Sequence, residues 1–160
     1  AGHGFEVILE PGRVIAGNAG VLLTTALYEK QAPDRTFLII DAGMNDLIRP
    51  ALYGAHHDIR PLVEPAQGAA EKTYDVVGPI CESTDKFATG RALPEVAPGD
   101  RLAFMSAGAY GAVLSSAYNA RPLVPEVLVN GEHYSVVRRR PDFEEMTMLE
   151  EVPDWIKAKA

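Results

Sequence analysis

The sequence predicts a mainly β domain, built as an antiparallel β-sandwich or Greek-key barrel. Three observations lead to this prediction: many short runs are rich in β-forming apolar residues, Gly, Pro, Asp and Asn residues separate them, and helical periodicity is rare. With 160 residues, of which 47% are hydrophobic, the chain can bury one sizeable core. We therefore expect one domain with at most a small appended element.

A βα unit is expected ahead of the β domain. Residues 5–9 (F-E-V-I-L) predict a short strand, and residues 14–20 (V-I-A-G-N-A-G) predict a brief helical turn that glycines close. A strand that ends in a glycine-containing turn at the start of a helix is typical of such a unit. Further helices are expected only at residues 46–53 and 141–146, the second with Pro141 in its first turn.

Eight later runs have the period-two pattern and the composition of strands. They are residues 21–28, 36–41, 59–63, 74–77, 101–105, 111–118, 125–129 and 134–138. Two of the turns between them are well specified, because Asn130-Gly131 is the signal of a type I′ hairpin and Pro98-Gly99 suits a type II turn. Short strands joined by such turns favour antiparallel pairing.

The charge of the chain argues against a nucleic-acid partner. The formal net charge is -7, whereas binding to a phosphate backbone needs a basic face. The only dense basic run, residues 138–140, is followed at once by acidic residues, so we interpret it as a solvated strand end, with a binding patch as the alternative. No run approaches the roughly 20 apolar residues of a membrane span, and no signal peptide is visible.

Cys81 is the only cysteine of the chain, so no internal disulfide can form. No Cys/His spacing suggests structural zinc, and we expect a reducing, cytoplasmic compartment. The sequence begins A-G-H-G-F, and its first methionine is residue 44. We therefore expect the later part of a longer polypeptide or a processed product.

Two segments have the composition of anion-binding sites. In Glu10-Pro11-Gly12-Arg13, the glycine permits close approach of the backbone, and the N–H groups of a helix start can bind phosphate. In residues 41–53, Pro50 suits a first helical turn and places Arg49 and Tyr53 over the same face, where both can bind a carboxylate. An ordinary turn and a surface arginine beside a core tyrosine are the alternatives.

Two further segments could contribute reactive side chains. Cys81 precedes Glu82 and other polar residues, which suggests a loop thiol able to act as an acid or nucleophile. The alternatives are a buried thiol, and caps formed by Ser83 or Asp85 as the reason for the polar run. Glycines flank Tyr110, so a sharp turn could present its ring at a strand end, unless the tyrosine simply begins a strand. His56-His57 point to opposite faces of an extended chain, and we assign them no metal.

Four segments in this order closely resemble one family. They are E-P-G-R (10–13), D-A-G-M-N-D-L-I-R-P-A-L-Y (41–53), G-P-I-C-E-S-T-D (78–85) and G-A-Y-G (108–111). The family is the diaminopimelate decarboxylases, in the alanine-racemase-like, fold-type III group of pyridoxal-phosphate enzymes. The resemblance implies a (β/α)8 barrel followed by a C-terminal β domain. Residues 1–30 would be the end of that barrel with a crossover strand, and residues 31–160 would be the β domain.

The resemblance implies a role for several residues at a pyridoxal 5′-phosphate site. Residues 10–13 would meet the cofactor phosphate mainly through backbone groups, so that Glu10, Gly12 and Arg13 become cofactor-binding residues. Tyr110 would touch both cofactor and substrate.

The resemblance also implies the residues that handle substrate. Arg13, Arg49 and Tyr53 would hold its carboxylate. Glu82 would hold its distal amino group, and Cys81 would donate the proton that replaces the lost carboxylate. The implied reaction converts meso-2,6-diaminopimelate to L-lysine and CO2, a step of lysine biosynthesis.

The family's Schiff-base lysine has no counterpart in this chain. Lys30, Lys72, Lys86, Lys157 and Lys159 all lie in polar or terminal contexts, which do not supply the depressed pKa that such a lysine needs. We therefore interpret the chain as part of an enzyme, whose partners would be the barrel half and a second subunit. In the family, the C-E-S motif reaches the neighbour's site across a two-fold homodimer.

Two other functions remain open from the sequence. One is a related decarboxylase that acts on ornithine, arginine or carboxynorspermidine. The pair of carboxylate-binding residues favours a substrate with a distal carboxylate, which ornithine lacks. The other is a non-catalytic β module that binds or regulates. The sequence that precedes Ala1 would discriminate between an enzyme and a non-catalytic module, since a barrel strand that ends in lysine would indicate the enzyme.

Overall fold

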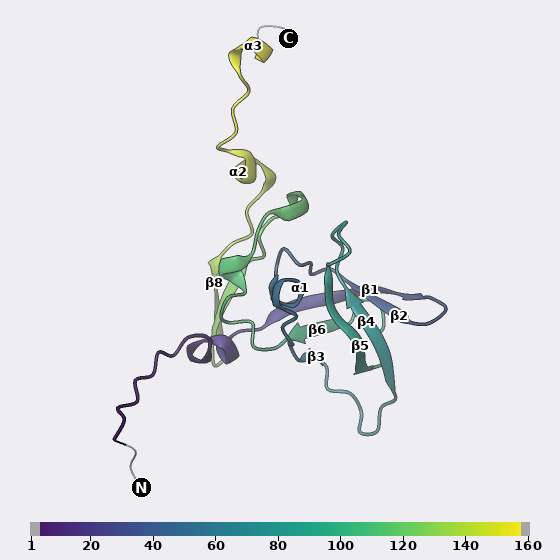
Figure 1. Cartoon of the computed structure of the whole chain (residues 1–160). Helices are drawn as coiled ribbons and strands as arrows, with labels where there is room; N and C mark the ends of the chain where they lie inside the picture. Colours follow the sequence, from purple (N-terminus) through teal and green to yellow (C-terminus); the bar gives the residue numbers. More distant parts are fainter. Residues whose placement is uncertain (1–3, 158–160) are drawn as a thin grey trace. The chain divides into compact units, whose positions relative to one another are not determined.

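The computed structural model describes residues 4–157 (Figure 1). The chain forms two compact units, which divide between Ser115 and Ser116. Strands dominate the first unit, which confirms the predicted mainly β class.

A six-stranded sheet organises the first unit. In the order of the sheet, its strands are β3 (Ile59–Pro61), β6 (Arg101–Phe104), β1 (Leu22–Gln31), β2 (Thr36–Ile40), β4 (Glu71–Val77) and β5 (Lys86–Pro94). The two strands at the ends of this order, β3 and β5, also contact each other. The sheet is therefore nearly closed, as a barrel requires.

The core lies inside this curved sheet because apolar side chains alternate along its strands. Leu38 and Ile40 of β2 are buried, and so are Leu102 and Phe104 of β6, each pair two residues apart. The Phe104 ring lies 4.6 Å from that of Phe87, measured between centroids.

One strand pair departs from the predicted antiparallel arrangement. β2 and β4 run parallel, with Phe37, Leu38 and Ile39 opposite residues 75–77. Parallel neighbours need a crossover connection. Here residues 41–70 form that crossover, and they include the short helix α1 (Arg49–Tyr53) and strand β3.

Three sequence predictions of secondary structure are wrong. Residues 5–9 form no strand, because none of the described residues supplies a pairing partner, and the βα unit reduces to the 3₁₀ turns η1 (Arg13–Ile15) and η2 (Gly17–Ala19). Residues 111–118 form the 3₁₀ turn η3 (Ala112–Leu114), which the Ser115 hydroxyl closes by donating to Ala112 O, instead of a strand. Strand β5 was not predicted, because Gly90 interrupts its pattern.

The remaining predicted elements of the first unit are confirmed, with small differences at their ends. Helix α1 has Pro50 in its first turn, as predicted, and Gly54 closes it in a left-handed conformation (φ 62°). Gly99 has φ 93°, as the second central residue of a type II turn requires.

The second unit contains short elements only. They are η4 (Tyr118–Ala120), β7 (Glu126–Asn130), β8 (His133–Arg138), α2 (Phe143–Thr147) and α3 (Asp154–Lys157), the last not predicted. β7 and β8 pair as the predicted hairpin, but Gly131 and Glu132 are its central residues, and only Gly131 has a positive φ. Asp142 and Glu145 cap α2 reciprocally.

Residues 138–140 match a solvated strand end. Arg138 is ion-paired with Glu126, Arg139 is ion-paired with Glu145, and Arg140 is exposed. Among residues 4–157, no helix has the length and apolarity needed to span a bilayer.

Candidate functional site

The loop after β6 packs closely on the turns η1 and η2. Ala107 N donates to Gly20 O at 2.8 Å, and Gly108 N donates to Gly17 O at 3.0 Å. A Cβ atom at Gly108 would stand 2.2 Å from Ala16 O, so only glycine permits this approach. The packing brings the loop that carries Tyr110 beside the segment that carries Gly12.

Gly12 and Arg13 lie at the start of η1. The exposed backbone of Gly12 faces Tyr110, since a Cβ atom there would be 3.6 Å from the tyrosine hydroxyl. The Arg13 guanidinium is held by a 2.7 Å hydrogen bond from Nη2 to Ser106 O. Its Nε is buried and has no partner among the described residues, so it could donate to a bound anion.

Arg49, Tyr53 and Tyr110 form a cluster, which we call the arginine–tyrosine cluster. The Arg49 guanidinium carbon lies 5.5 Å from the Tyr53 ring centroid and 5.8 Å from that of Tyr110. Both distances lie in the range of cation–π contacts. With Leu114, these side chains line a hollow of about 360 Å³.

Tyr110 adopts a left-handed backbone conformation, with φ 57°. This conformation is uncommon for a bulky residue and is often found at ligand sites. The close packing of Gly108 holds it, which places the tyrosine ring against Arg49.

His57 lies buried close to both arginines. Its Nδ1 is 2.8 Å from Met105 O, and because a carbonyl can only accept, the proton sits on Nδ1. Nε2 is buried without a partner among the described residues. Burial lowers the pKa of His57 below its ordinary value of 6.5, and the charges of Arg13 and Arg49 lower this pKa further. The ring is therefore neutral beside the two cations.

Cys81 and Glu82 lie on the turn between β4 and β5, and both are exposed. Neither lines the hollow of the arginine–tyrosine cluster. Within one chain, the structure thus brings Gly12, Arg49, Tyr53 and Tyr110 together, but not the thiol. Glu10 lies in the exposed segment before η1, which has no regular secondary structure.

The described lysines do not suit a cofactor Schiff base. Lys72 donates to both carboxylate oxygens of Glu29 at 2.6 and 2.7 Å, and this hydrogen bonding raises its pKa. Lys30, Lys86 and Lys157 are exposed, and Lys159 lies outside the described residues. Residues 4–157 thus offer groups for the phosphate of pyridoxal phosphate, namely the exposed Gly12 backbone and the unpartnered Arg13 Nε, but no lysine suited to its aldehyde.

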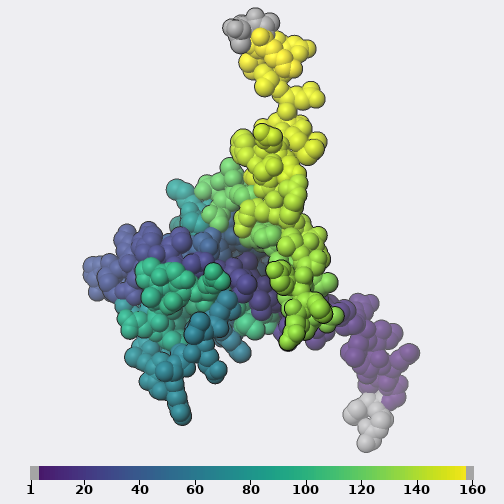
Figure 2. Space-filling model, turned by 180° about the vertical axis from the view of Figure 1, so that it is seen from behind, coloured from purple at the N-terminus to yellow at the C-terminus, as the bar shows by residue number. Residues whose placement is uncertain are grey.

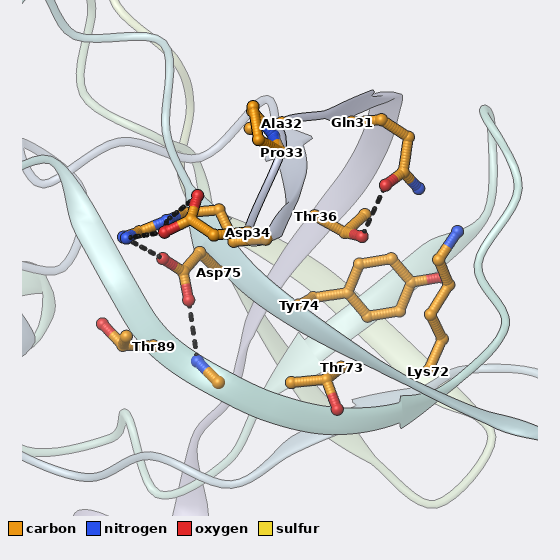
Figure 3. A pocket seen from close by; sticks show the side chains of 12 residues that line it. Gln31, Ala32, Pro33, Asp34, Thr36, Lys72, Thr73, Tyr74, Asp75 and Thr89 are labelled. Carbon is orange, nitrogen blue, oxygen red and sulfur yellow. Dashed lines mark hydrogen bonds and ion pairs between the residues drawn. The ribbon is translucent and has the colours of Figure 1, made fainter.

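A larger hollow, of about 590 Å³, contains none of the predicted site residues (Figure 3). The turn between β1 and β2 (residues 31–36), residues 72–75 of β4 and residues 89–90 of β5 line it. Arg35 is ion-paired there with Asp34 and Asp75, and Asp75 also accepts from Gly90 N at 2.8 Å. Lys72, which also lines the hollow, is ion-paired with Glu29, so all charged side chains of the hollow form structural ion pairs.

Sequence reasoning missed two buried residues beside the site. It considered His57 only as a metal ligand and Asp85 only as a cap. Among the described residues, no group of three or more His, Cys, Asp or Glu side chains is placed to hold a metal ion. The hydrogen-bond partner of His57, the carbonyl of Met105, is 48 residues away in the sequence and could not be read from the neighbours of His57.

Comparison with known proteins gives a consistent family assignment. The family model described as "Pyridoxal-dependent decarboxylase, C-terminal sheet domain" matches residues 14–108. The diaminopimelate decarboxylase of Vibrio cholerae is 52% identical over 147 residues, which are 92% of this chain and 34% of that protein. That of Zymomonas mobilis is 45% identical over 157 residues, which are 97% of this chain and 36% of that protein.

Solved structures of full enzymes share this fold. The crystal structure of diaminopimelate decarboxylase from Helicobacter pylori, complexed with L-lysine, has a TM-score of 0.80 and 43% identity. The match covers 88% of this chain and 34% of that one. The chain thus spans about a third of the length of the relatives it matches.

Proposed function

Because the chain belongs to the pyridoxal-dependent decarboxylases, as their C-terminal sheet domain, we propose that it forms the C-terminal part of a diaminopimelate decarboxylase. Such an enzyme removes one carboxylate from meso-2,6-diaminopimelate and yields L-lysine and CO2. The identities of 52% and 45% to enzymes of that name favour this substrate over ornithine, arginine and carboxynorspermidine.

The arginine–tyrosine cluster is the observation that carries the proposal. Arg49 lies between two tyrosine rings at one end of a hollow, and its Nε is buried with no described partner. A guanidinium held in this way can bind a carboxylate with two parallel hydrogen bonds. Tyr53 can donate a third hydrogen bond from its hydroxyl.

A second carboxylate-binding group comes from Arg13. Its charge and that of Arg49 both lower the pKa of His57. Because His57 is neutral, it adds no positive charge to that of the two arginines, and we expect this charge to suit one carboxylate. We propose that Arg13, Arg49 and Tyr53 bind the substrate's distal carboxylate, and that Glu82 binds the amino group beside it.

Pyridoxal phosphate, when bound, withdraws electrons from the substrate carbon that loses its carboxylate. In this chain, the exposed backbone of residues 10–13, including Glu10, Gly12 and Arg13, would contact the phosphate. Tyr110 would contact both the cofactor and the substrate, because its hydroxyl faces Gly12 while its ring faces Arg49.

Cys81 would hold the proton that replaces CO2. Its thiol is exposed on a turn, and a positioned thiol can deliver a proton to carbon. Cys81 does not line the hollow of its own chain. We therefore propose that it serves the site of a second subunit in a homodimer with shared sites.

The proposal includes the rest of the enzyme. A (β/α)8 barrel half would supply the cofactor lysine, with residues 1–30 as the end of that barrel and residues 31–160 as the β domain. The enzyme would act in the cytoplasm.

The proposal is tested with the purified full-length protein supplied with pyridoxal phosphate. We expect CO2 release from meso-2,6-diaminopimelate and none from ornithine or arginine. Arg49→Lys should reduce kcat/KM by roughly 10- to 100-fold, because lysine loses the fork that matches a carboxylate and a charged hydrogen bond contributes about 1.5–3 kcal/mol. Arg60→Lys, at an exposed arginine paired with Asp58, is the matched control and should change nothing. Activity on arginine alone would overturn the substrate, and equal loss in both variants would overturn the role of Arg49.

Mixing two inactive variants tests the shared site. In a dimer of one Cys81→Ser subunit and one Arg49→Ala subunit, one site carries both defects and the other carries neither. With free exchange, half of the dimers are mixed, so about a quarter of wild-type activity should return. Native mass spectrometry monitors the exchange. If mixed dimers form and activity stays absent, Cys81 does not serve its neighbour's site.

A further inference from the structure

The turn that carries Cys81 and Glu82 is folded on itself by backbone hydrogen bonds. Glu82 N donates to Ile80 O at 2.8 Å, Asp85 N donates to Glu82 O at 3.0 Å, and Gly78 N donates to Asp85 O at 3.0 Å. The Ile80 side chain, next to Cys81, is buried and anchors the turn. The exposed thiol is therefore presented by a well-ordered turn.

The carboxylate of Asp85 joins this turn to a second one. Asp85 is only 4% exposed, and its Oδ2 accepts from Ile80 N at 2.6 Å. Its Oδ1 accepts from Met44 N at 2.7 Å. Ile80 directly precedes Cys81, and Met44 belongs to the turn of residues 42–48 that leads into α1 and Arg49. The Asp85 side chain thus accepts hydrogen bonds from the turn that carries Cys81 and from the turn that leads to Arg49.

Both turns approach each other so closely that glycine is required at the contact. A Cβ atom at Gly78 would stand 2.4 Å from Asp85 Oδ2 and 2.6 Å from Ala42 O. A Cβ atom at Gly43 would stand 2.7 Å from Asn45 Oδ1 and 2.9 Å from Ile80 Cγ1. The separation between the two turns is therefore fixed by close packing around the carboxylate.

We propose that Asp85 is a positioning residue of the enzyme, whose buried carboxylate fixes the Cys81–Glu82 turn relative to α1. The inference rests on the proposed function, in which Cys81 donates a proton and Arg49 binds substrate. Two backbone N–H donors meet at this point, and an ionised carboxylate offers each of them its own oxygen. An amide of the same shape has one oxygen and would point N–H groups at the other donor.

The arrangement has a consequence for the shared sites. If Arg49 serves its own subunit's site and Cys81 serves the neighbour's, Asp85 joins the turn that leads to Arg49 to the turn that carries Cys81. A shift of either turn then reaches both sites. Asp85 would thus keep the geometry of the two sites of the dimer matched to each other.

The test substitutes Asp85→Asn in the full-length holoenzyme. A misplacement of catalytic groups by about 1 Å can lower a rate by roughly 100-fold, so we expect kcat to fall by about that factor and KM to rise as well. We also expect the rate of alkylation of Cys81 by iodoacetamide to change, measured by mass spectrometry of the Cys81 peptide. Alkylation needs no turnover, so it tests the position of the turn even if the substrate is not diaminopimelate.

Asp75→Asn is the matched control. Asp75 is also 4% exposed and also accepts from a backbone N–H, that of Gly90, but it pairs with Arg35 beside the larger hollow. Both substitutions remove a buried carboxylate of the first unit, so both should lower stability. Only Asp85→Asn should change kcat, KM and Cys81 alkylation. Equal changes in both variants, or no change in alkylation with Asp85→Asn, would overturn the proposal.

A measurement on the wild-type protein keeps the proposal testable if Asp85→Asn does not fold. The amides of Met44 and Ile80 should exchange with deuterium more slowly than the amide of the exposed Cys81, which directly follows Ile80, because both donate to a buried acceptor. Faster exchange at either amide would show that the carboxylate does not hold the two turns.

Discussion

Both units of the chain contain strands with apolar side chains, but only the first unit buries them. In the first unit, apolar side chains of β2, β4 and β6 form a buried core. In the second unit, no residue of the described range 116–157 is buried, although it contains a well-formed hairpin. Residues of this hairpin are visible at the surface as yellow-green atoms in Figure 2. The strand pattern therefore predicts the presence of strands in both units, but it predicts buried side chains correctly only in the first unit.

The physical reason is the number of strands. Six strands in a nearly closed sheet shield one face from water, whereas a two-stranded hairpin leaves both faces exposed and is marginally stable by itself. Val129, Tyr134 and Val136 of the hairpin remain more than half exposed. The stability of the described chain must reside mainly in the first unit, and substitutions can test this.

The largest difference is expected between Phe104→Ala and Tyr134→Ala. Phe104 is 0% exposed and packs on Phe87, so its truncation should lower the free energy of unfolding by about 3–5 kcal/mol. Tyr134 is 77% exposed, and its truncation should stay within about 0.5 kcal/mol. Urea denaturation of the two variants measures both values. Similar losses would mean that the hairpin is as well packed as the sheet.

The stability losses caused by glycine-to-alanine substitutions in the two units should differ by an intermediate amount. Gly78→Ala places a Cβ atom 2.4 Å from Asp85 Oδ2, and overpacking of this kind costs about 1–3 kcal/mol. Gly131→Ala meets no atom within 4 Å and pays only for its left-handed backbone (φ 60°), about 1 kcal/mol. Thermal unfolding followed by circular dichroism compares them. A larger loss at Gly131 would contradict the assignment of close packing to the first unit.

The smallest expected effects concern pH, and the two units should respond in different ranges. His57 has a folded-state pKa below 6.5, so the folded state binds fewer protons, and its stability falls as the pH drops below 6.5. Glu145, whose ion pair with Arg139 lowers its pKa to about 2, stabilises the second unit above 4.5, and this contribution is lost as the pH falls from 4.5 to about 2.

Unfolding free energies measured across these ranges check both assignments. His57→Gln should remove the pH dependence of the unfolding free energy in the upper pH range, and Glu145→Gln should remove it in the lower range. High salt should weaken only the effect of Glu145, since its pair is exposed. A pH dependence that survives His57→Gln unchanged would assign the upper range to another group.

Local signals in the sequence were enough for most of the fold. Alternation and turn residues predicted β1–β4 and β6–β8, and Pro50 predicted the start of α1. The parallel pairing of β2 and β4 could not be predicted in this way, because alternation within one strand does not specify its neighbour. The strand predicted at residues 111–118 is wrong for a related reason, because the period-two pattern cannot reveal that Ser115 closes a turn.

The candidate site was predicted in part. Motifs identified Arg49, Tyr53 and Tyr110, which the structure brings together. The same motifs contained Asp85 but not its role, because its partner Met44 is 41 residues away in the sequence. Polar residues that follow a strand look like a solvated loop until long-range contacts show which of them are buried.

The crossover between β2 and β4 has a consequence for how the chain folds. The hairpins β1–β2 and β4–β5 join strands through short turns, whereas the parallel pair forms only when the ends of residues 41–70 meet, with the entropy loss of closing a long loop. That loop contains Arg49 and Tyr53. The ordering of the proposed carboxylate-binding residues and this non-local step of strand pairing are thus the same event, so a chain that has not closed its sheet has not assembled the proposed binding site.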